Sequence, residues 1–253
     1  MDKPIKKYGQ DPILEAICEF HFVPSEKWNK NSEKLIHKTV IADFPEKKVC
    51  HLKSEEYQEV AKCSSKQDED ETITQFWSTD KNAIIQVSTN FICINHKKPY
   101  PTWKFYFPLI KEGLLAYLDA NPEQTIARIQ MTYINRIELP GNRAELRDYL
   151  NFYPESSDSL PMIMNSFVVG ATIPVDDFRN GLIKLQINTS NKIDERKTIP
   201  IMMEISHRRM FDPATGADKA LDWVEQSHFI VRDMFEASIT SETKKLFGEP
   251  NND

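Results

Sequence analysis

Glycine is scarce in this chain, with 7 residues among 253, whereas average usage is about 7%. Phosphate-binding loops need closely spaced glycines, and neither G-x-x-x-x-G-K-[ST] nor G-x-G-x-x-G occurs. The motifs H-E-x-x-H and G-x-S-x-G do not occur either. The chain therefore lacks the signatures of P-loop nucleotide hydrolysis, dinucleotide redox chemistry, zincin proteolysis and α/β-hydrolase chemistry.

Long apolar runs and paired cysteines are also missing. No stretch approaches 18 consecutive apolar residues, and the first ten residues are polar and lysine-bearing. We therefore expect neither a transmembrane helix nor a secretory signal peptide. The four cysteines are Cys18, Cys50, Cys63 and Cys93, and none forms a C-x-x-C pair. This pattern favours reduced thiols in a cytoplasmic protein.

An excess of positive charge is absent as well. The chain has 32 Lys and Arg against 38 Asp and Glu, a net charge of −6. Such a balance excludes a general attraction to nucleic acids or to anionic membranes. Hydrophobic residues make up 40% and charged residues 28%, which is typical of an ordinary globular protein.

The hydrophobic pattern predicts one order of elements that occurs twice, namely a strand, a helix, three or four strands and a long helix. Strands are expected at 13–23, 47–60, 72–78, 83–89, 91–96, 127–139, 166–174, 182–188 and 199–208. Helices are expected at 28–44, 102–118, 142–150, 218–238 and 241–248. Thr102 is the expected N-cap of the second helix, and Asn142 with Glu145 forms a capping box for the third. Polar stretches predict loops at 63–71, 153–161 and 212–216.

These elements predict an α+β protein with two pseudo-repeated halves, residues 1–125 and 126–253, packed as one unit. Each half can bury one face of a meander under its long helix, and the halves can join edge to edge into one mostly antiparallel sheet. The order is similar to a TATA-box-binding-protein-like fold. A helix-grip fold, in which one long helix is held by a curled sheet, is the alternative.

Four stretches carry a resemblance to a known family. They are Pro12 to Ala16 (PILEA) with Glu19 and Phe22, Tyr100 to Trp103 (YPTW), Tyr133 to Ile137 (YINRI), and His228 with Phe235 to Thr240 (FEASIT). Together they resemble the sporadically distributed prokaryotic protein family of unknown function, over nearly the whole chain. The resemblance implies a cytosolic protein from patchily inherited, defence-associated or mobile loci. It implies no catalytic residues.

Polar side chains alternate along several of the expected strands. Because alternation places each set on one side of its strand, we expect one broad, mixed-charge surface opposite the helices. A one-sided sheet also has such a face simply to meet water. The residues proposed for a recognition platform are Glu15, Glu19, Arg136, Glu138, Lys184, Gln186, Glu204 and Arg208.

Metal and histidine chemistry has few candidates in the sequence. No two histidines are spaced i, i+4, and we expect no metal site or other cofactor. Asp176 and Asp177, with Glu204, are the nearest approach to a nuclease cluster. His228 lies on the apolar stripe of the last long helix, as a hydrogen-bonded core histidine or as a pH- or ligand-sensitive group. The His207-Arg208-Arg209 run is either a solvated strand end or an anion contact.

Aromatic residues suggest one further grouping. Tyr100 and Trp103 of the aromatic turn, with Trp28 and Trp77, are candidates for a common cluster in the core or at its rim. Only a small basic patch, His96 to Lys98, accompanies them, so stacking on nucleic acid is not expected.

Three functions remain open from the sequence. We expect a non-enzymatic binding or regulatory subunit whose sheet face engages a protein partner. That partner could be an effector or toxin encoded nearby, a suggestion that the resemblance alone implies. The alternatives are a small-ligand sensor with a cavity between long helix and sheet, and a metal-dependent nuclease. Nucleic acid is not the expected main partner, and a homo-oligomer is left open.

Overall fold

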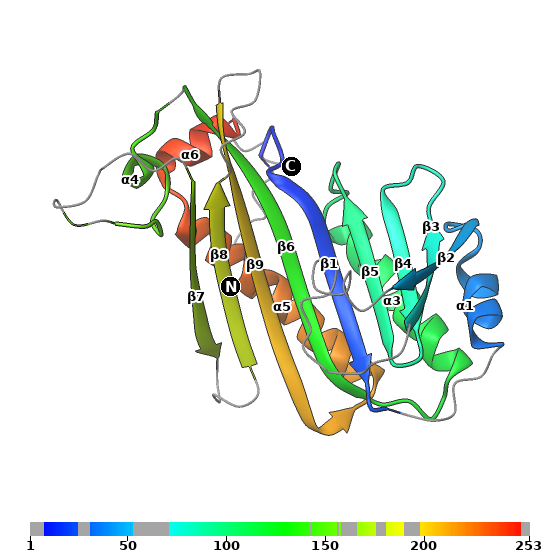
Figure 1. Ribbon diagram of the computed structural model, residues 1–253. Helices are drawn as coiled ribbons and strands as arrows, with labels where there is room; N and C mark the ends of the chain where they lie inside the picture. Colours follow the sequence, from blue (N-terminus) through cyan, green and yellow to red (C-terminus); the bar gives the residue numbers. More distant parts are fainter. Residues whose placement is uncertain are drawn as a thin grey trace.

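A single nine-stranded antiparallel sheet forms the centre of the protein (Figure 1). The computed structural model describes residues 8–24, 31–52, 71–141, 143–155, 157, 166–175, 181–189 and 198–248. The strands follow the order β2-β3-β4-β5-β1-β6-β9-β8-β7. Their bounds are β1 Ile13–Phe22, β2 Glu46–Leu52, β3 Glu71–Trp77, β4 Ala83–Ser88, β5 Phe91–Lys97, β6 Ile126–Pro140, β7 Phe167–Val175, β8 Gly181–Thr189 and β9 Thr198–Thr215.

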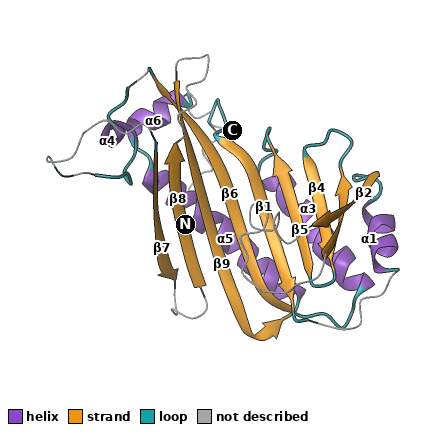
Figure 2. Ribbon diagram, in the orientation of Figure 1, coloured by secondary structure: helices purple, strands orange, loops and turns teal. Residues whose placement is uncertain are grey.

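The two long helices, α3 and α5, cover the same face of the sheet (Figure 2). Helix α3 packs on β5 and α5 packs on β6 and β9, while α1 packs against α3. The described helices are α1 Ser32–Val40, α3 Trp103–Ala120, α4 Leu146–Tyr149, α5 Ala217–Ser238 and α6 Ser241–Leu246. Within the described ranges, none of them is long and apolar enough to cross a membrane.

Strand alternation explains which side of the sheet forms the core. In β1, Ala16, Cys18 and Phe20 are fully buried beneath the helices, while the residues between them are half-buried. Helix α5 contributes its stripe in the same way, because Val224 and Val231 lie two turns apart on its buried face. The α+β class and the antiparallel sheet expected from the sequence are confirmed.

Several local predictions are wrong. The sequence predicts a helix from residue 142, whereas α4 begins at Leu146 with Glu145 in the N-cap position and no side-chain cap. Asn142, the other member of the expected capping box, lies outside the described residues. By contrast, the prediction that Thr102 is the N-cap residue of α3 is confirmed, although its side chain makes no capping hydrogen bond. The loop expected at 212–216 belongs largely to β9, which continues to Thr215 through an irregular stretch opposite the start of β6. Most of the acidic stretch 63–71 lies outside the described residues.

Candidate functional site

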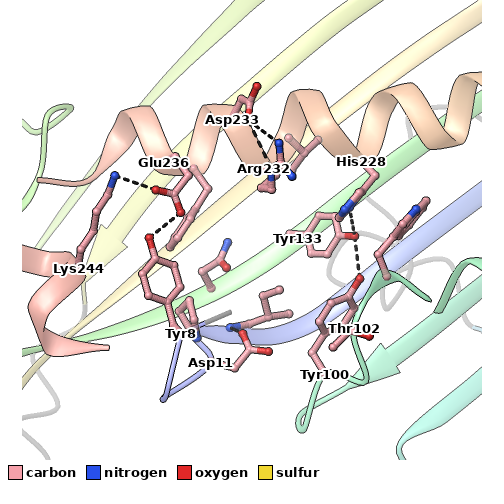
Figure 3. Close-up of a pocket in the computed structure, with 16 residues that line it drawn as sticks. Tyr8, Asp11, Tyr100, Thr102, Tyr133, His228, Arg232, Asp233, Glu236 and Lys244 are labelled. Carbon is pink, nitrogen blue, oxygen red and sulfur yellow. Dashed lines mark hydrogen bonds and ion pairs between the residues drawn. The ribbon is translucent and has the colours of Figure 1, made fainter. Parts of the chain in front are cut away.

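A cavity of about 470 Å³ lies between α5, the first turn of α3, the start of β1 and the middle of β6 (Figure 3). Its walls therefore come from both ends of the chain and from both long helices. The apolar wall includes Ile13 on β1 and Val231 and Phe235 on α5. The volume is typical of a small-molecule pocket, since such pockets span about 300 to 1,000 Å³.

The periodicity of each element directs its side chains into this cavity. On β6, Tyr133 and Asn135 lie on the helix-facing side, two residues apart, and both are buried. On α5, His228, Val231 and Phe235 recur at intervals of three and four residues and so share one face. The cavity is thus formed where the buried stripe of α5 crosses the central strands.

A hydrogen-bonded chain of aromatic side chains crosses one wall (Figure 3). The Tyr100 hydroxyl lies 3.1 Å from the Tyr133 hydroxyl, which lies 2.9 Å from Nδ1 of His228. The ring of Trp103 stacks on the His228 imidazole, with 4.0 Å between the ring centroids. These contacts connect the segment between β5 and α3, the first turn of α3, the middle of β6 and α5 at His228.

Burial sets the protonation states of the three hydrogen-bonded side chains. Burial, with a smaller contribution from the nearby Arg232 charge, lowers the pKa of His228 to about 3. Burial also raises the pKa of Tyr100 and that of Tyr133 well above their ordinary value. All three groups are therefore neutral near pH 7.

Charged side chains occupy the opposite end of the cavity (Figure 3). Glu236 accepts a hydrogen bond from the Tyr8 hydroxyl at 2.6 Å and pairs with Lys244 of α6 at 2.7 Å. Arg232, which pairs with Asp233 at 3.1 Å, lies between this end and His228 (Figure 3). The cavity therefore has an aromatic, neutral end and a charged end.

The eight residues predicted for a recognition platform all lie on the sheet face opposite the helices. The register aligns Glu15, Ile134, Glu204 and Gln186 in one row across β1, β6, β9 and β8. A second row contains Glu19 and Arg208, joined through Gln130. The remaining members are Arg136, Glu138 and Lys184. Each lies an even number of residues from Ile134 or Gln186 on its own strand, so its side chain points to the same face.

Many charges on this face are paired within it. Arg136 contacts Glu138 at 2.5 Å, and Glu138 also accepts a hydrogen bond from Thr198 at 2.6 Å. Glu15 accepts a hydrogen bond from Asn95 at 2.8 Å. Lys184 lies 4.0 Å from Glu204. The platform residues thus form a surface of partly neutralised charges.

The aromatic grouping expected from the sequence is only partly present. Tyr100 and Trp103 line the cavity together. Trp77 instead lies on the platform face, where the ammonium groups of Lys48 and Lys97 are 4.8 and 5.0 Å from its ring centroid. Trp28 lies outside the described residues.

The residues proposed for histidine and nuclease chemistry do not form a common site among the described residues. Asp176 and Asp177 lie outside the described residues, and Glu204 is on the platform face. Across the part of the chain that the structure describes, no three His, Cys, Asp or Glu side chains gather as a metal site would require. His207 is not part of a solvated strand end, because it is buried and hydrogen-bonds Ser227 at 3.0 Å.

Sequence reasoning missed Tyr8, Arg232 and Lys244 as cavity residues. Nothing in local periodicity relates a segment before β1 to α5 and α6. Arg232 had a usable signal, because it follows His228 by one turn and therefore lies near its face of the helix. The four stretches that carry the family resemblance all contribute to the cavity wall, through Pro12, Tyr100, Tyr133 and His228 among others.

No protein-family model matches the chain, and no curated protein is significantly similar to it.

Proposed function

We propose that this protein is a non-catalytic small-ligand-binding protein, and that the ligand occupies the cavity between α5 and the central strands. The observation that carries this proposal is the 470 Å³ cavity itself. Its volume falls within the range of small-molecule pockets, and its lining combines apolar side chains with a few polar groups, as such pockets do.

The composition of the walls supports binding rather than catalysis. With a pKa of about 3, His228 is unprotonated near neutral pH and cannot serve as a general acid, and Tyr133 keeps its proton there. The carboxylate of Glu236 is bound by Tyr8 and Lys244. These groups therefore provide shape and hydrogen bonds, as a recognition site requires.

The resemblance described from the sequence supports the same location. Its four stretches are distant in the chain, yet each supplies part of one cavity wall. We therefore propose that the protein belongs to the sporadically distributed prokaryotic family. We also propose that its role in a defence-associated or mobile locus depends on this site.

We test the proposal with N-phenyl-1-naphthylamine, an uncharged probe whose fluorescence rises in apolar surroundings. We expect one molecule to bind per chain. Val231→Phe should abolish binding, because Val231 lines the cavity and the larger ring fills it. Val168→Phe is the matched control, since Val168 is 73% exposed on the edge strand β7 and should leave binding unchanged. Equal binding by both variants would refute the cavity as the site.

A second candidate function is the recognition platform for a protein partner. It is favoured by the register, which aligns the eight platform residues on one face. Arg136→Glu and Arg208→Glu should each weaken co-purification of a stoichiometric partner from the native host while the free energy of unfolding changes little. Unchanged co-purification would remove the platform from consideration, as would a protein that purifies alone.

We also propose that the two halves arose by duplication of one unit. From the edge of the sheet to its centre, the first half has the order β2-β3-β4-β5-β1 and the second half has the order β7-β8-β9-β6. In each half the first strand in sequence is central and the following strands run inward from the edge, and the first half has one strand more. This arrangement favours a TATA-box-binding-protein-like order over a helix-grip one. It supports the ligand proposal because a cavity at the junction of two similar units is lined by both.

A further inference from the structure

The acidic side chains of the cavity wall already have partners. Glu236 is bound by Tyr8 and Lys244, and Asp233 is paired with Arg232. Asp11 accepts a hydrogen bond at 2.9 Å from the backbone N–H of Ile13. A cationic ligand would have to compete with these contacts.

Hydrogen-bond donors in the wall, by contrast, have capacity left over. Two nitrogens of Arg232 bond the same oxygen of Asp233, at 3.4 and 3.1 Å. The third, Nη1, is buried and has no hydrogen-bond partner among the described residues. A buried guanidinium nitrogen left in this state is unfavourable, so an acceptor at this point would stabilise the protein.

His228 offers a second donor one helical turn away. Its side chain is buried, with the residue 7% exposed, and Nδ1 is occupied by Tyr133. If Tyr100 donates to Tyr133 and Tyr133 donates to Nδ1, both hydroxyl protons take part in hydrogen bonds among these three side chains. The imidazole proton is then on Nε2. The reverse direction would leave the Tyr100 proton with no acceptor among the described residues.

The first turn of α3 adds a favourable potential for negative charge. Thr102 and Trp103 both line the cavity, and the Thr102 side chain does not cap the helix. The positive end of the helix dipole is therefore not offset by a side-chain cap there. Stacking of Trp103 on His228 brings this helix end beside the imidazole.

We propose that the cavity binds an organic monocarboxylate, whose carboxylate accepts hydrogen bonds from Arg232 and from Nε2 of His228. Its apolar body packs against Ile13, Val231 and Phe235. A single negative charge fits because Arg232 is the cation of the described lining that lies one helical turn from the neutral His228. This inference rests on the ligand-binding function proposed above.

The test is displacement of bound N-phenyl-1-naphthylamine by matched pairs of competitors. The pairs are 4-phenylbutyrate with 4-phenylbutyramide, and octanoate with octanamide, so that each pair differs in charge at nearly constant shape. We expect each acid to displace the probe at about tenfold lower concentration than its amide, because hydrogen bonds to charged groups are the stronger ones.

Arg232→Gln should remove that advantage, so that acids and amides displace the probe at about equal concentrations. The circular dichroism spectrum of the variant checks that it is folded. Lys245→Gln is the charge-matched control, because Lys245 is exposed and pairs with Glu242 outside the cavity.

The possible failures are distinguishable. If acids and amides compete equally, or if Arg232→Gln retains the preference for acids, the carboxylate proposal is overturned while the cavity function stands. If the probe does not bind to the unaltered protein, both proposals fall.

Discussion

At the scale of single residues, His228 shows how surroundings decide chemistry. The same side chain on a surface would titrate near pH 6.5. Here it stacks on Trp103 and hydrogen-bonds Tyr133, and burial lowers its pKa to about 3. The imidazole is therefore a neutral hydrogen-bonding group across the physiological range, which suits ligand recognition.

The first prediction concerns the pH dependence of stability through His228. Its pKa is lower in the folded protein than in the unfolded chain, so the unfolded chain takes up the proton first as pH falls. The contribution is complete above about pH 6.5 and is lost progressively down to about pH 3, by up to about 1.4 kcal/mol per pH unit.

His228→Asn keeps a hydrogen-bonding atom near the position of Nδ1 but does not titrate. The difference in free energy of unfolding between the unaltered protein and this variant should therefore shrink from pH 7 to pH 4. Urea denaturation at each pH measures it. A difference that stays constant over this range would show that the pKa of His228 is not lowered in the folded state.

At the scale of elements, the contact between α3 and the sheet depends on one small residue. A Cβ atom placed on Gly113 would lie 3.1 Å from Cγ1 of Ile94 and 3.5 Å from Cδ1 of Ile85. Glycine within a helix is usually unfavourable, by about 1 kcal/mol relative to alanine. Close approach of α3 to β4 and β5 explains its presence.

The second prediction follows from this contact. Gly113→Ala should change the free energy of unfolding little, because the gain in helix propensity offsets a slight shift of the Ile94 side chain. Gly113→Val should destabilise the protein by about 1 to 3 kcal/mol relative to the alanine variant, through overpacking. Chemical denaturation compares the two, and equal stability would mean that α3 can move away from the sheet without loss.

The start of α4 shows that tertiary contacts can outweigh a local capping signal in the sequence. Asn142 and Glu145 have the spacing of a capping box, yet α4 begins at Leu146. The C-cap residue of α4, Leu150, is fully buried and pairs with Ile239 through a β-bridge, and Asn151 donates its backbone N–H to the carbonyl of Ser238. Packing against the end of α5 positions this short helix more strongly than the capping signal does.

At the scale of the whole molecule, the pair formed by β1 and β6 joins the two halves. It is an antiparallel ladder along nearly all of β1, and both strands bury residues beneath the helices. The ends of the described chain meet as well, because Gln10 donates its backbone N–H to the carbonyl of Phe247 at 2.8 Å. The halves therefore share one core.

The third prediction is that neither half folds alone. A fragment of residues 1–125 would expose the edge of β1, and the fragment 126–253 would expose that of β6. We expect each to be unfolded or aggregated by circular dichroism and gel filtration, and the two co-expressed fragments to form a soluble complex. The intact chain should unfold in one calorimetric transition. Two separated transitions, or a folded single fragment, would contradict a shared core.

The amino-acid sequence alone was sufficient to predict the strands, the long helices and the common face of the platform residues. Alternation with a period of two and recurrence at three to four residues are local properties, and they survive in any tertiary arrangement. For this reason Glu15 and Arg208 could be assigned to one face without knowing which strands are neighbours.

The cavity depended on the tertiary structure. Tyr8, Tyr133, Arg232 and Lys244 come together only because β1 pairs with β6 and α5 packs on β6 and β9. Burial, which lowers the pKa of His228 and leaves Arg232 Nη1 without a hydrogen-bond partner among the described residues, is a property of that assembly. Pairing across long stretches of chain is governed by the packing of whole layers, and no local periodicity encodes it.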